Sequence, residues 1–426
     1  MSADPGHADD VERAARWVAD YVREMGGTAE LTGPRSHPLV VGEVPASRAG
    51  ASDEVPTVLL YGHYDVQPPG DLDAWESPPF EPRIHDGWLY GRGSADDKGN
   101  FFLLLRAVRE LRAEGALPVH VRILSDGEEE IIGHSVVEYL RDDHREALAC
   151  VIFDGPMLQR DRPLLVVGTR GLLYFHVRLS TGRSDMHSGF FGGAALNAGH
   201  AVARMVAELE ATWDELEPGF DEPSVAERSA WAELPDPEDL LAAFGARPAD
   251  ASAVERFYER TTGRFAADIN GIHCGEARLQ KTVIPVEASV NLSLRLVPGQ
   301  DPEIVSASLE EMLRRATPSG ADVEIERWAC TPAALMPSTA PVIEQGREAF
   351  RDVFGTLPSV VRTGGTVPIM STLADRGIPT IMTGLDTLEG NAHAPNERLL
   401  LEYIPKGIEV AKGILARLSR LSGGAG

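Results

Sequence analysis

The chain has 426 residues, of which 65 are acidic and 40 are basic, so its formal net charge is −25 at pH 7. This balance excludes the basic surface that nucleic acids and anionic membranes require, but it is compatible with metal cations. No run of about eighteen apolar residues is present, which excludes a membrane span. At this length the chain is expected to form two domains with sizeable cores.

The first residues and the cysteines both favour the cytoplasm. The N-terminal stretch MSADPGHADDVERAARW is acidic and lacks the apolar core of a signal peptide. Cys150, Cys274 and Cys330 are far apart and form no CxxC pair, which predicts reduced thiols rather than disulfides or a zinc finger. We therefore expect a cytoplasmic protein with neither a nucleic-acid nor a membrane partner.

In chain order, apolar residues at helical spacing first predict a helix over 9–25, which Gly26-Gly27 ends. Short apolar strands then alternate with helices. The predicted strands are 57–63, 119–126 and 149–154, and the predicted helices are 99–115 and 135–146. This alternation is typical of an α/β fold with a doubly wound, mostly parallel sheet.

The pattern changes after Gly171 and returns near residue 340. Strands that alternate apolar and polar residues, as in a sheet with one solvated face, are predicted at 172–180, 287–297 and 322–328, with helices at 194–214 and 301–316. A helix at 340–354, a strand at 379–384 and a helix at 402–420 then resume the α/β pattern, while 214–240 looks the least ordered. We predict a catalytic domain of residues 1–172 and 334–426, into which an α+β domain of residues 173–333 is inserted.

Acidic and imidazole side chains gather where the predicted strands end. His63 and Asp65 lie two apart on an extended segment and so point to one face. Asp154 follows the third strand, and open α/β sheets bind ligands at these carboxyl ends. The glutamates 128–130 follow the second strand. An ordinary explanation is that they favour the first turn of the next helix, and the alternative is that they face a cation.

Two loops supply the remaining candidate metal ligands. Asp96 and Asp97 lie between glycines, and His393 lies in the small-residue loop GNAHAPNE. Two imidazoles with three carboxylates suit Zn²⁺, Mn²⁺ or Co²⁺, and one bridging carboxylate would let five ligands hold two ions. The sequence thus predicts a two-metal centre of His63, Asp96, Glu130, Asp154 and His393.

Six ordered motifs resemble the M20 family of metallopeptidases, in its dipeptidase (carnosinase-like) branch. They are LLYGHYDVQPPGDLDAWESPPFEP, DGWLYGRGSADDKG, GEEEIIG, SDMHSG, KTVIPVEASVNLSLRLVPGQ and GNAHAPNE. The resemblance implies that His63 and Asp154 bind one metal, that His393 and Glu130 bind the other, and that Asp96 bridges them. It implies a cis peptide between Asp96 and Asp97.

The resemblance also implies roles around the metals. Asp65 would orient His63, and Glu129 would be the general base that takes a proton from the bridging water. Arg295 would pair with the substrate carboxylate, with Thr282, Gly365 and Thr366 lining the substrate site. The inserted domain would be a lid and dimerisation domain, and its His187 would reach the active site of the partner subunit in a homodimer.

Two features depart from the family pattern. Relatives continue the double glutamate as Glu-Glu-x-Gly-Ser, whereas here Ile132 stands where the Gly would be and Gly133 follows. A one-residue slip would make Glu128 or Glu129 the base. A second lid histidine that relatives carry before a proline is absent from Cys330-Thr331-Pro332.

The leading hypothesis is a two-metal exopeptidase that cleaves dipeptides or short peptides with a free C-terminal carboxylate, and Zn²⁺ is the favoured metal. Asp rather than Glu at position 154 goes, in this family, with dipeptidases and aminopeptidases. The alternative enzyme is an N-acyl or N-carbamoyl amino acid amidohydrolase, a desuccinylase-like deacylase with the same metals. A non-catalytic binding protein on the same scaffold is the third hypothesis, and the complete set of site residues argues against it.

Overall fold

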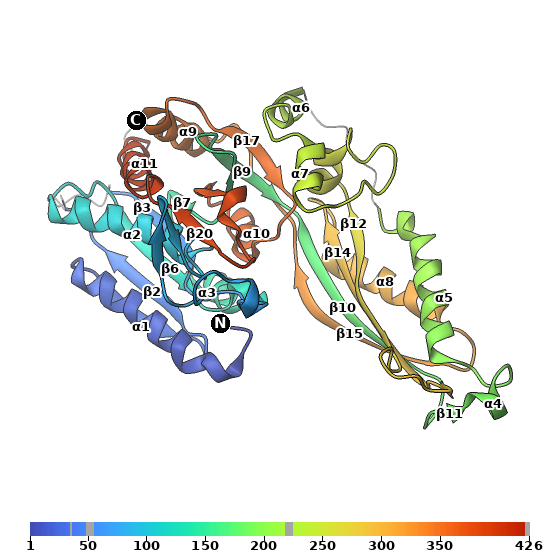
Figure 1. The fold of residues 1–426 in the computed structure, drawn as a ribbon. Coiled ribbons are helices and arrows are strands. Elements are labelled where there is room, and N and C mark those ends of the chain that lie inside the picture. Colours follow the sequence, from blue (N-terminus) through green and yellow to red (C-terminus); the bar gives the residue numbers. More distant parts are fainter. Residues whose placement is uncertain (35, 48–54, 218–224, 422–426) are drawn as a thin grey trace.

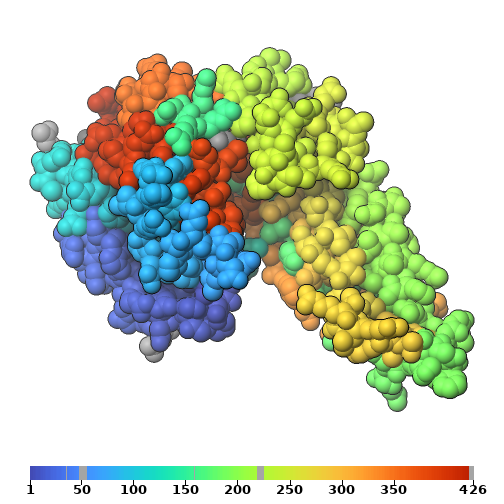
Figure 2. Space-filling model, viewed as in Figure 1, coloured from blue at the N-terminus to red at the C-terminus, as the bar shows by residue number. Residues whose placement is uncertain are grey.

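The computed structural model describes residues 1–34, 36–47, 55–217 and 225–421. Figure 1 shows two units: an α/β unit formed by both ends of the chain, and an elongated unit formed by its middle. In the space-filling view an open notch separates the blue part of the first unit from the yellow part of the second (Figure 2).

The α/β unit is built on a nine-stranded sheet with the order β1-β2-β6-β3-β7-β18-β9-β16, in which β17 also pairs with β9. The central strands β6, β3, β7 and β18 are parallel to one another, while β1, β2 and β16 pair antiparallel at the sides. The strands are β1 (Thr28–Thr32), β2 (Leu39–Val44), β3 (Thr57–His63), β6 (His120–Asp126), β7 (Ala149–Ile152), β9 (Leu164–Thr169), β16 (Ala334–Leu335), β17 (Ser359–Thr363) and β18 (Thr380–Met382).

Helices cover both faces of this sheet and bury its apolar side chains in two cores. Helices α1, α2, α9 and α11 pack into one core, and α3 and α10 pack into the other. Their bounds are α1 (Ala8–Glu24), α2 (Lys98–Ala113), α3 (Ser135–Asp142), α9 (Pro341–Phe354), α10 (Pro368–Asp375) and α11 (Tyr403–Leu418). The predicted α/β fold with a mostly parallel centre and helices on both faces is confirmed.

The elongated unit contains a four-stranded antiparallel sheet in the order β12-β14-β10-β15. Its bounds are β10 (Gly171–Ser180), β12 (Ala266–Cys274), β14 (Glu287–Leu296) and β15 (Asp322–Thr331). Helices α5 (Ala198–Glu210) and α8 (Pro302–Ala316) share a core with one face of the sheet, which alternate residues such as Phe175 and Val177 enter. The separate α+β unit expected from the alternating pattern is present.

The chain passes between the two sheets at 170 and at 332–333, where β9 gives way to β10 and β15 gives way to β16. The domain limits at 172 and 334 stay a prediction. Part of the segment expected to be least ordered is helical, as α6 (Val225–Trp231) and α7 (Pro237–Ala243), and 218–224 lie outside the described residues. Among the helices that the structure describes, none is both long enough and apolar enough to cross a bilayer.

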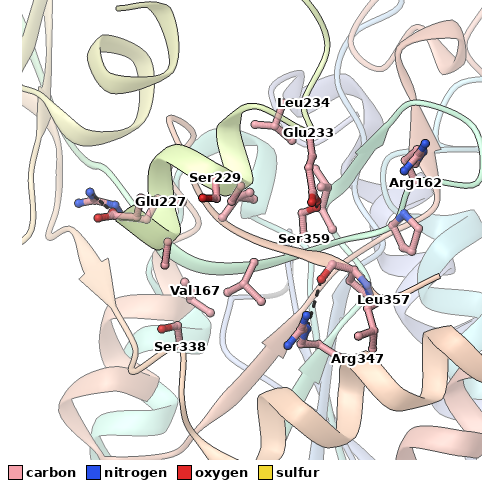
Figure 3. A pocket seen from close by; sticks show the side chains of 18 of the residues that line it. Arg162, Val167, Glu227, Ser229, Glu233, Leu234, Ser338, Arg347, Leu357 and Ser359 are labelled. Carbon is pink, nitrogen blue, oxygen red and sulfur yellow. Dashed lines mark hydrogen bonds and ion pairs between the residues drawn. The ribbon is translucent and has the colours of Figure 1, made fainter. Parts of the chain in front are cut away.

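Helix α6 of the inserted segment rests on β17 of the α/β unit. Glu227 pairs with Arg362, and Glu233 accepts a hydrogen bond from Ser359. A cavity of about 1210 Å³ lies between these elements, bordered also by Arg162, Val167 and Arg347 (Figure 3). No predicted site residue lines it, so volume alone does not mark the active site of this chain.

Candidate metal centre

His63 ends β3 and is completely buried among three carboxylates. Its Nδ1 lies 3.2 Å from Asp65 Oδ1, and its Nε2 lies 3.0 Å from Asp96 Oδ1 and 4.0 Å from Asp154 Oδ2. These residues meet because β3 runs parallel to β7, so that Asp154, two residues beyond β7, leaves the sheet at the same edge.

His393 gathers a second group of donors around the other oxygen of Asp96. Its Nε2 lies 2.9 Å from Asp96 Oδ2 and 3.2 Å from Glu130 Oε2. The two groups, His63-Asp96-Asp154 and Asp96-Glu130-His393, each have ligand atoms within 4.8 Å of one another. The structure therefore brings all five predicted metal ligands together, with Asp96 common to both groups.

These donors fit two divalent cations. Each group offers one imidazole and two carboxylates, a borderline-hard set that suits Zn²⁺, Mn²⁺ or Co²⁺. The second nitrogen of His63 faces the buried Asp65, as is usual for a metal-binding imidazole whose tautomer is fixed by a carboxylate.

The electrostatics of the cluster favour binding positive charge. Burial raises the pKa of Glu129 well above its usual range and also raises the pKa of Asp154. Contacts with Asp96 and Glu130 raise the pKa of His393 to about 10. Since metal ligands must lose their protons, binding of a metal at this cluster competes with protons.

The three adjacent glutamates have three different environments. Glu128 accepts hydrogen bonds from the Ser135 backbone N–H (3.2 Å) and hydroxyl (2.8 Å) at the start of α3. Glu130 accepts from the Gln67 backbone N–H at 3.0 Å and from its side-chain amide at 2.8 Å. Glu129 lies between them in a short 3-10 helix (Glu129–Ile131). None of the three lies in the first turn of α3, and only Glu128 contacts the N-terminus of that helix, through Ser135.

Two residues that the sequence analysis did not single out hold this centre. Gln67 fixes Glu130, and Glu397, which is fully buried, organises the loop that carries Asp96. Glu397 accepts from Arg92 at 2.6 Å and from the backbone N–H groups of Gly93, Ala95 and Asp96 at 2.9–3.0 Å. The only signal for this role was the position of Glu397 in the GNAHAPNE motif. The Asp96–Asp97 peptide is cis, as the resemblance implied.

The departure from the family pattern at Ile132 has a conformational consequence. Ile132 adopts φ 57° and ψ 44°, the left-handed region that suits glycine. Gly133 has a different reason to be glycine, because a Cβ there would lie 2.1 Å from Glu128 Cβ.

Ile132→Gly is expected to stabilise the protein by about 1 kcal/mol, because glycine relieves the left-handed strain of a β-branched residue at some cost in chain entropy. Scanning calorimetry should show a higher melting temperature for this variant. Gly133→Ala is the control of opposite sign, and an Ile132→Gly variant that melts below the wild type would contradict the strain argument.

The predicted substrate residues fall into two separate places. Arg295 on β14 donates from Nη1 to Thr366 Oγ1 at 2.8 Å, close to Gly365. His187 and Thr282 lie together elsewhere, where Ser188 donates to the Thr282 carbonyl at 2.9 Å beside the short pair of β11 (Met186–His187) and β13 (Val283–Ile284). Figure 1 shows β11 at the end of the elongated unit farthest from the α/β unit. The structure does not bring His187 to the metal ligands of its own chain.

An α/β sheet that presents two overlapping carboxylate–imidazole groups beside a partly buried glutamate, with a second unit inserted, defines a metal-dependent hydrolase. The comparison with known families agrees with this class. The chain belongs to peptidase family M20/M25/M40, whose model matches residues 59–417. Membership of this family implies divalent metal ions.

Individual relatives extend the match over nearly the whole chain. The chain is 29% identical to the cysteinylglycine-S-conjugate dipeptidase of Corynebacterium striatum (87% of this chain, 81% of the relative) and 29% identical to the beta-Ala-His dipeptidase of Rattus norvegicus (96% and 87%). Among solved structures, an M20 family metallo-carboxypeptidase of Sulfolobus solfataricus superposes with a TM-score of 0.86 at 27% identity (96% and 94%).

Human carnosine dipeptidase 1 superposes with a TM-score of 0.80 at 23% identity (98% and 92%), which shows the shared fold. The predicted family, its dipeptidase branch and the metallopeptidase class are confirmed by these matches.

Proposed function

We propose that this protein is a dipeptidase that hydrolyses the amide bond of dipeptides or short peptides with a free C-terminal carboxylate. The observation that carries the proposal is the position of Asp96, whose two oxygens face His63 and His393 separately while the partly buried Glu129 lies close to both. The similarity to dipeptidases of bacterial and mammalian origin supports the substrate class.

The proposed centre holds two divalent cations. His63 and Asp154 would hold one, His393 and Glu130 would hold the other, and Asp96 would contact both. Zn²⁺ is the favoured ion, and Mn²⁺ or Co²⁺ also suit these ligands. When bound, such a pair of cations polarises a carbonyl and makes water acidic enough to attack at neutral pH.

The residues around the ligands supply the proton transfers. Glu129 takes a proton from the attacking water and delivers it to the nitrogen of the leaving amine, a role that suits a carboxylate whose pKa is raised by burial. Asp65 holds His63 in place through the 3.2 Å contact with Nδ1.

Substrate contacts would come from both units. Arg295 would pair with the C-terminal carboxylate, with Thr366 and Gly365 lining the same place. His187 belongs to β11, at the far end of the elongated unit of its own chain, so it would act in the partner subunit of a homodimer and polarise the scissile carbonyl there, with the nearby Thr282 lining the substrate site.

Mixing two inactive variants should test the homodimer. If His187 acts in trans, His187→Ala and Glu129→Gln homodimers both lose activity, but a mixed dimer keeps one complete site. After unfolding and refolding of an equimolar mixture, about a quarter of wild-type activity is expected from random pairing. A mixture that stays inactive although mixed dimers form would show that His187 does not act across the interface.

A substrate panel tests the proposed reaction itself. The metal-reconstituted protein is assayed with dipeptides of varied side chain and chirality, and with N-acyl and N-carbamoyl amino acids. Hydrolysis of dipeptides is expected, and turnover of the acyl compounds alone would establish the amidohydrolase alternative instead. The cytoplasmic location stays a prediction from the sequence.

A further inference from the structure

Arg170 is the single residue between β9 of the α/β unit and β10 of the elongated unit. It is partly buried, and its main chain is fixed on both sides. Its N–H donates to the Gly365 carbonyl at 3.1 Å, and its carbonyl accepts from Thr366 Oγ1 at 2.6 Å. The first passage between the two sheets is thus bonded directly to the predicted substrate residues 365 and 366.

The side chain of Arg170 connects its own segment to two others that are distant in sequence, residues 260–264 and the turn at 364–366. Nε donates to the Gly364 carbonyl at 3.1 Å, while Nη1 donates to the carbonyls of Arg260 (3.4 Å) and Arg264 (3.3 Å). The planar fork of a guanidinium can reach carbonyls on several sides at once, which the single ammonium of lysine cannot. Arg170 therefore fixes the 364–366 turn relative to the inserted segment.

This turn in turn fixes Arg295. Thr366 Oγ1 accepts from Arg295 Nη1 at 2.8 Å while its own proton goes to the Arg170 carbonyl, so the hydroxyl is fully ordered. Burial first, and then the nearby charge of Arg295, lower the pKa of Arg170 to about 10. The opposing charge comes from Asp268, which is exposed. The positive charges of the Arg170 and Arg295 guanidiniums are offset only weakly by Asp268, so the space beside them favours a bound anion.

We propose that Arg170 is a positioning residue for the substrate carboxylate: it holds the 364–366 turn so that Thr366 aims the Arg295 guanidinium at that carboxylate. This inference rests on the proposed function, in which Arg295 binds the free C-terminus of the peptide. Recognition of the substrate carboxylate would then depend on Arg170, at the junction between the two units.

The test compares a dipeptide with its C-terminal amide in wild type, Arg170→Met and Arg295→Met. Arg170→Met is expected to raise KM for the free dipeptide about tenfold with kcat changed less than about threefold, because loss of an aimed charged hydrogen bond weakens binding by that order. The affinity for the amide, measured as KM or as an inhibition constant, is expected to stay within about threefold, since the amide lacks the charge that Arg295 recognises. A purely structural role would weaken both ligands equally, and that result would overturn the proposal.

Four further variants, Arg178→Met, Arg170→Lys, Thr366→Val and the double variant of Thr366→Val with Arg170→Met, separate the possible outcomes. Arg178→Met is the matched control, because Arg178 lies on the same strand β10 in an exposed pair with Glu324 and should leave both constants unchanged. Arg170→Lys keeps the charge but not the fork, and a raised KM for the free dipeptide alone supports the proposal even if the Met variant does not fold. Thr366→Val combined with Arg170→Met should add little to either single change, since both act through one connection; full additivity would contradict that connection.

Different results would overturn the carboxylate contact of Arg295 and the positioning role of Arg170. If Arg295→Met leaves the preference for the free carboxylate over the amide unchanged, the proposed carboxylate contact is wrong, and the inference about Arg170 falls with it. If Arg295→Met removes that preference while Arg170→Met and Arg170→Lys do not alter it, only the positioning role of Arg170 is overturned.

Discussion

Glu129→Gln is expected to lower kcat by a factor of about 10²–10⁴ without changing the metal content of the protein. The amide has the shape of the carboxylate but cannot accept the proton that the attacking water must lose. All five predicted metal ligands remain, so two cations per chain should still be found by elemental analysis. Parallel measurements of kcat and metal stoichiometry therefore separate loss of the base from loss of the metals.

The neighbouring Glu128 provides the matched control for this prediction. Glu128→Gln weakens the hydrogen bonds to Ser135 at the start of α3, which should lower stability by about 1 kcal/mol, but turnover should stay within twofold. The reverse result, an inactive Glu128→Gln that keeps its cations beside a Glu129→Gln that loses metal, would establish the one-residue slip that the unusual Ile132 raises. Glu138→Gln, on the exposed side of α3, controls for the change of charge alone.

The sequence predicted the parts of the site that depend on strand ends. His63 and Asp154 could be placed because buried parallel strands are short apolar runs, and the residues just after such a run lie at the carboxyl edge of the sheet. The antiparallel strands β1 and β2 received no prediction. The same is true of β12, an edge strand whose side chains are mostly exposed, so that burial leaves little periodic signal in it.

The interactions that hold the metal ligands were less accessible from sequence. Glu397 contacts the 92–96 loop about three hundred positions earlier in the chain, and a single buried carboxylate carries no pattern that reveals such a partner. Arg170 is similar, because the hydrogen bonds of its side chain within the described part of the chain all go to main-chain carbonyls, which every residue possesses. Sequence motifs thus identify residues that bind ligands more readily than residues that position them.

Asp96→Asn is expected to remove most of the activity by acting on both halves of the metal centre at once. The two oxygens of Asp96 lie 3.0 Å from His63 Nε2 and 2.9 Å from His393 Nε2, and among the described residues no other ligand candidate belongs to both groups. A neutral amide is a poorer ligand for a divalent cation than a carboxylate, and the affinity should fall by at least about 100-fold. Equilibrium dialysis should show fewer than two cations per chain, together with a loss of turnover of about 10³ or more.

The change in melting temperature on chelation tests the loss of metal affinity in Asp96→Asn independently of activity. A ligand at one hundred times its Kd stabilises a folded protein by about 2.7 kcal/mol, so chelation should lower the melting temperature of the wild type. Asp96→Asn should lose most of this response, because it binds the cations weakly with or without a chelator. Asp86→Asn changes an exposed carboxylate ten residues earlier and should respond like the wild type. An Asp96→Asn protein that keeps two cations and the full chelator response would show that the two groups of donors do not depend on their shared residue.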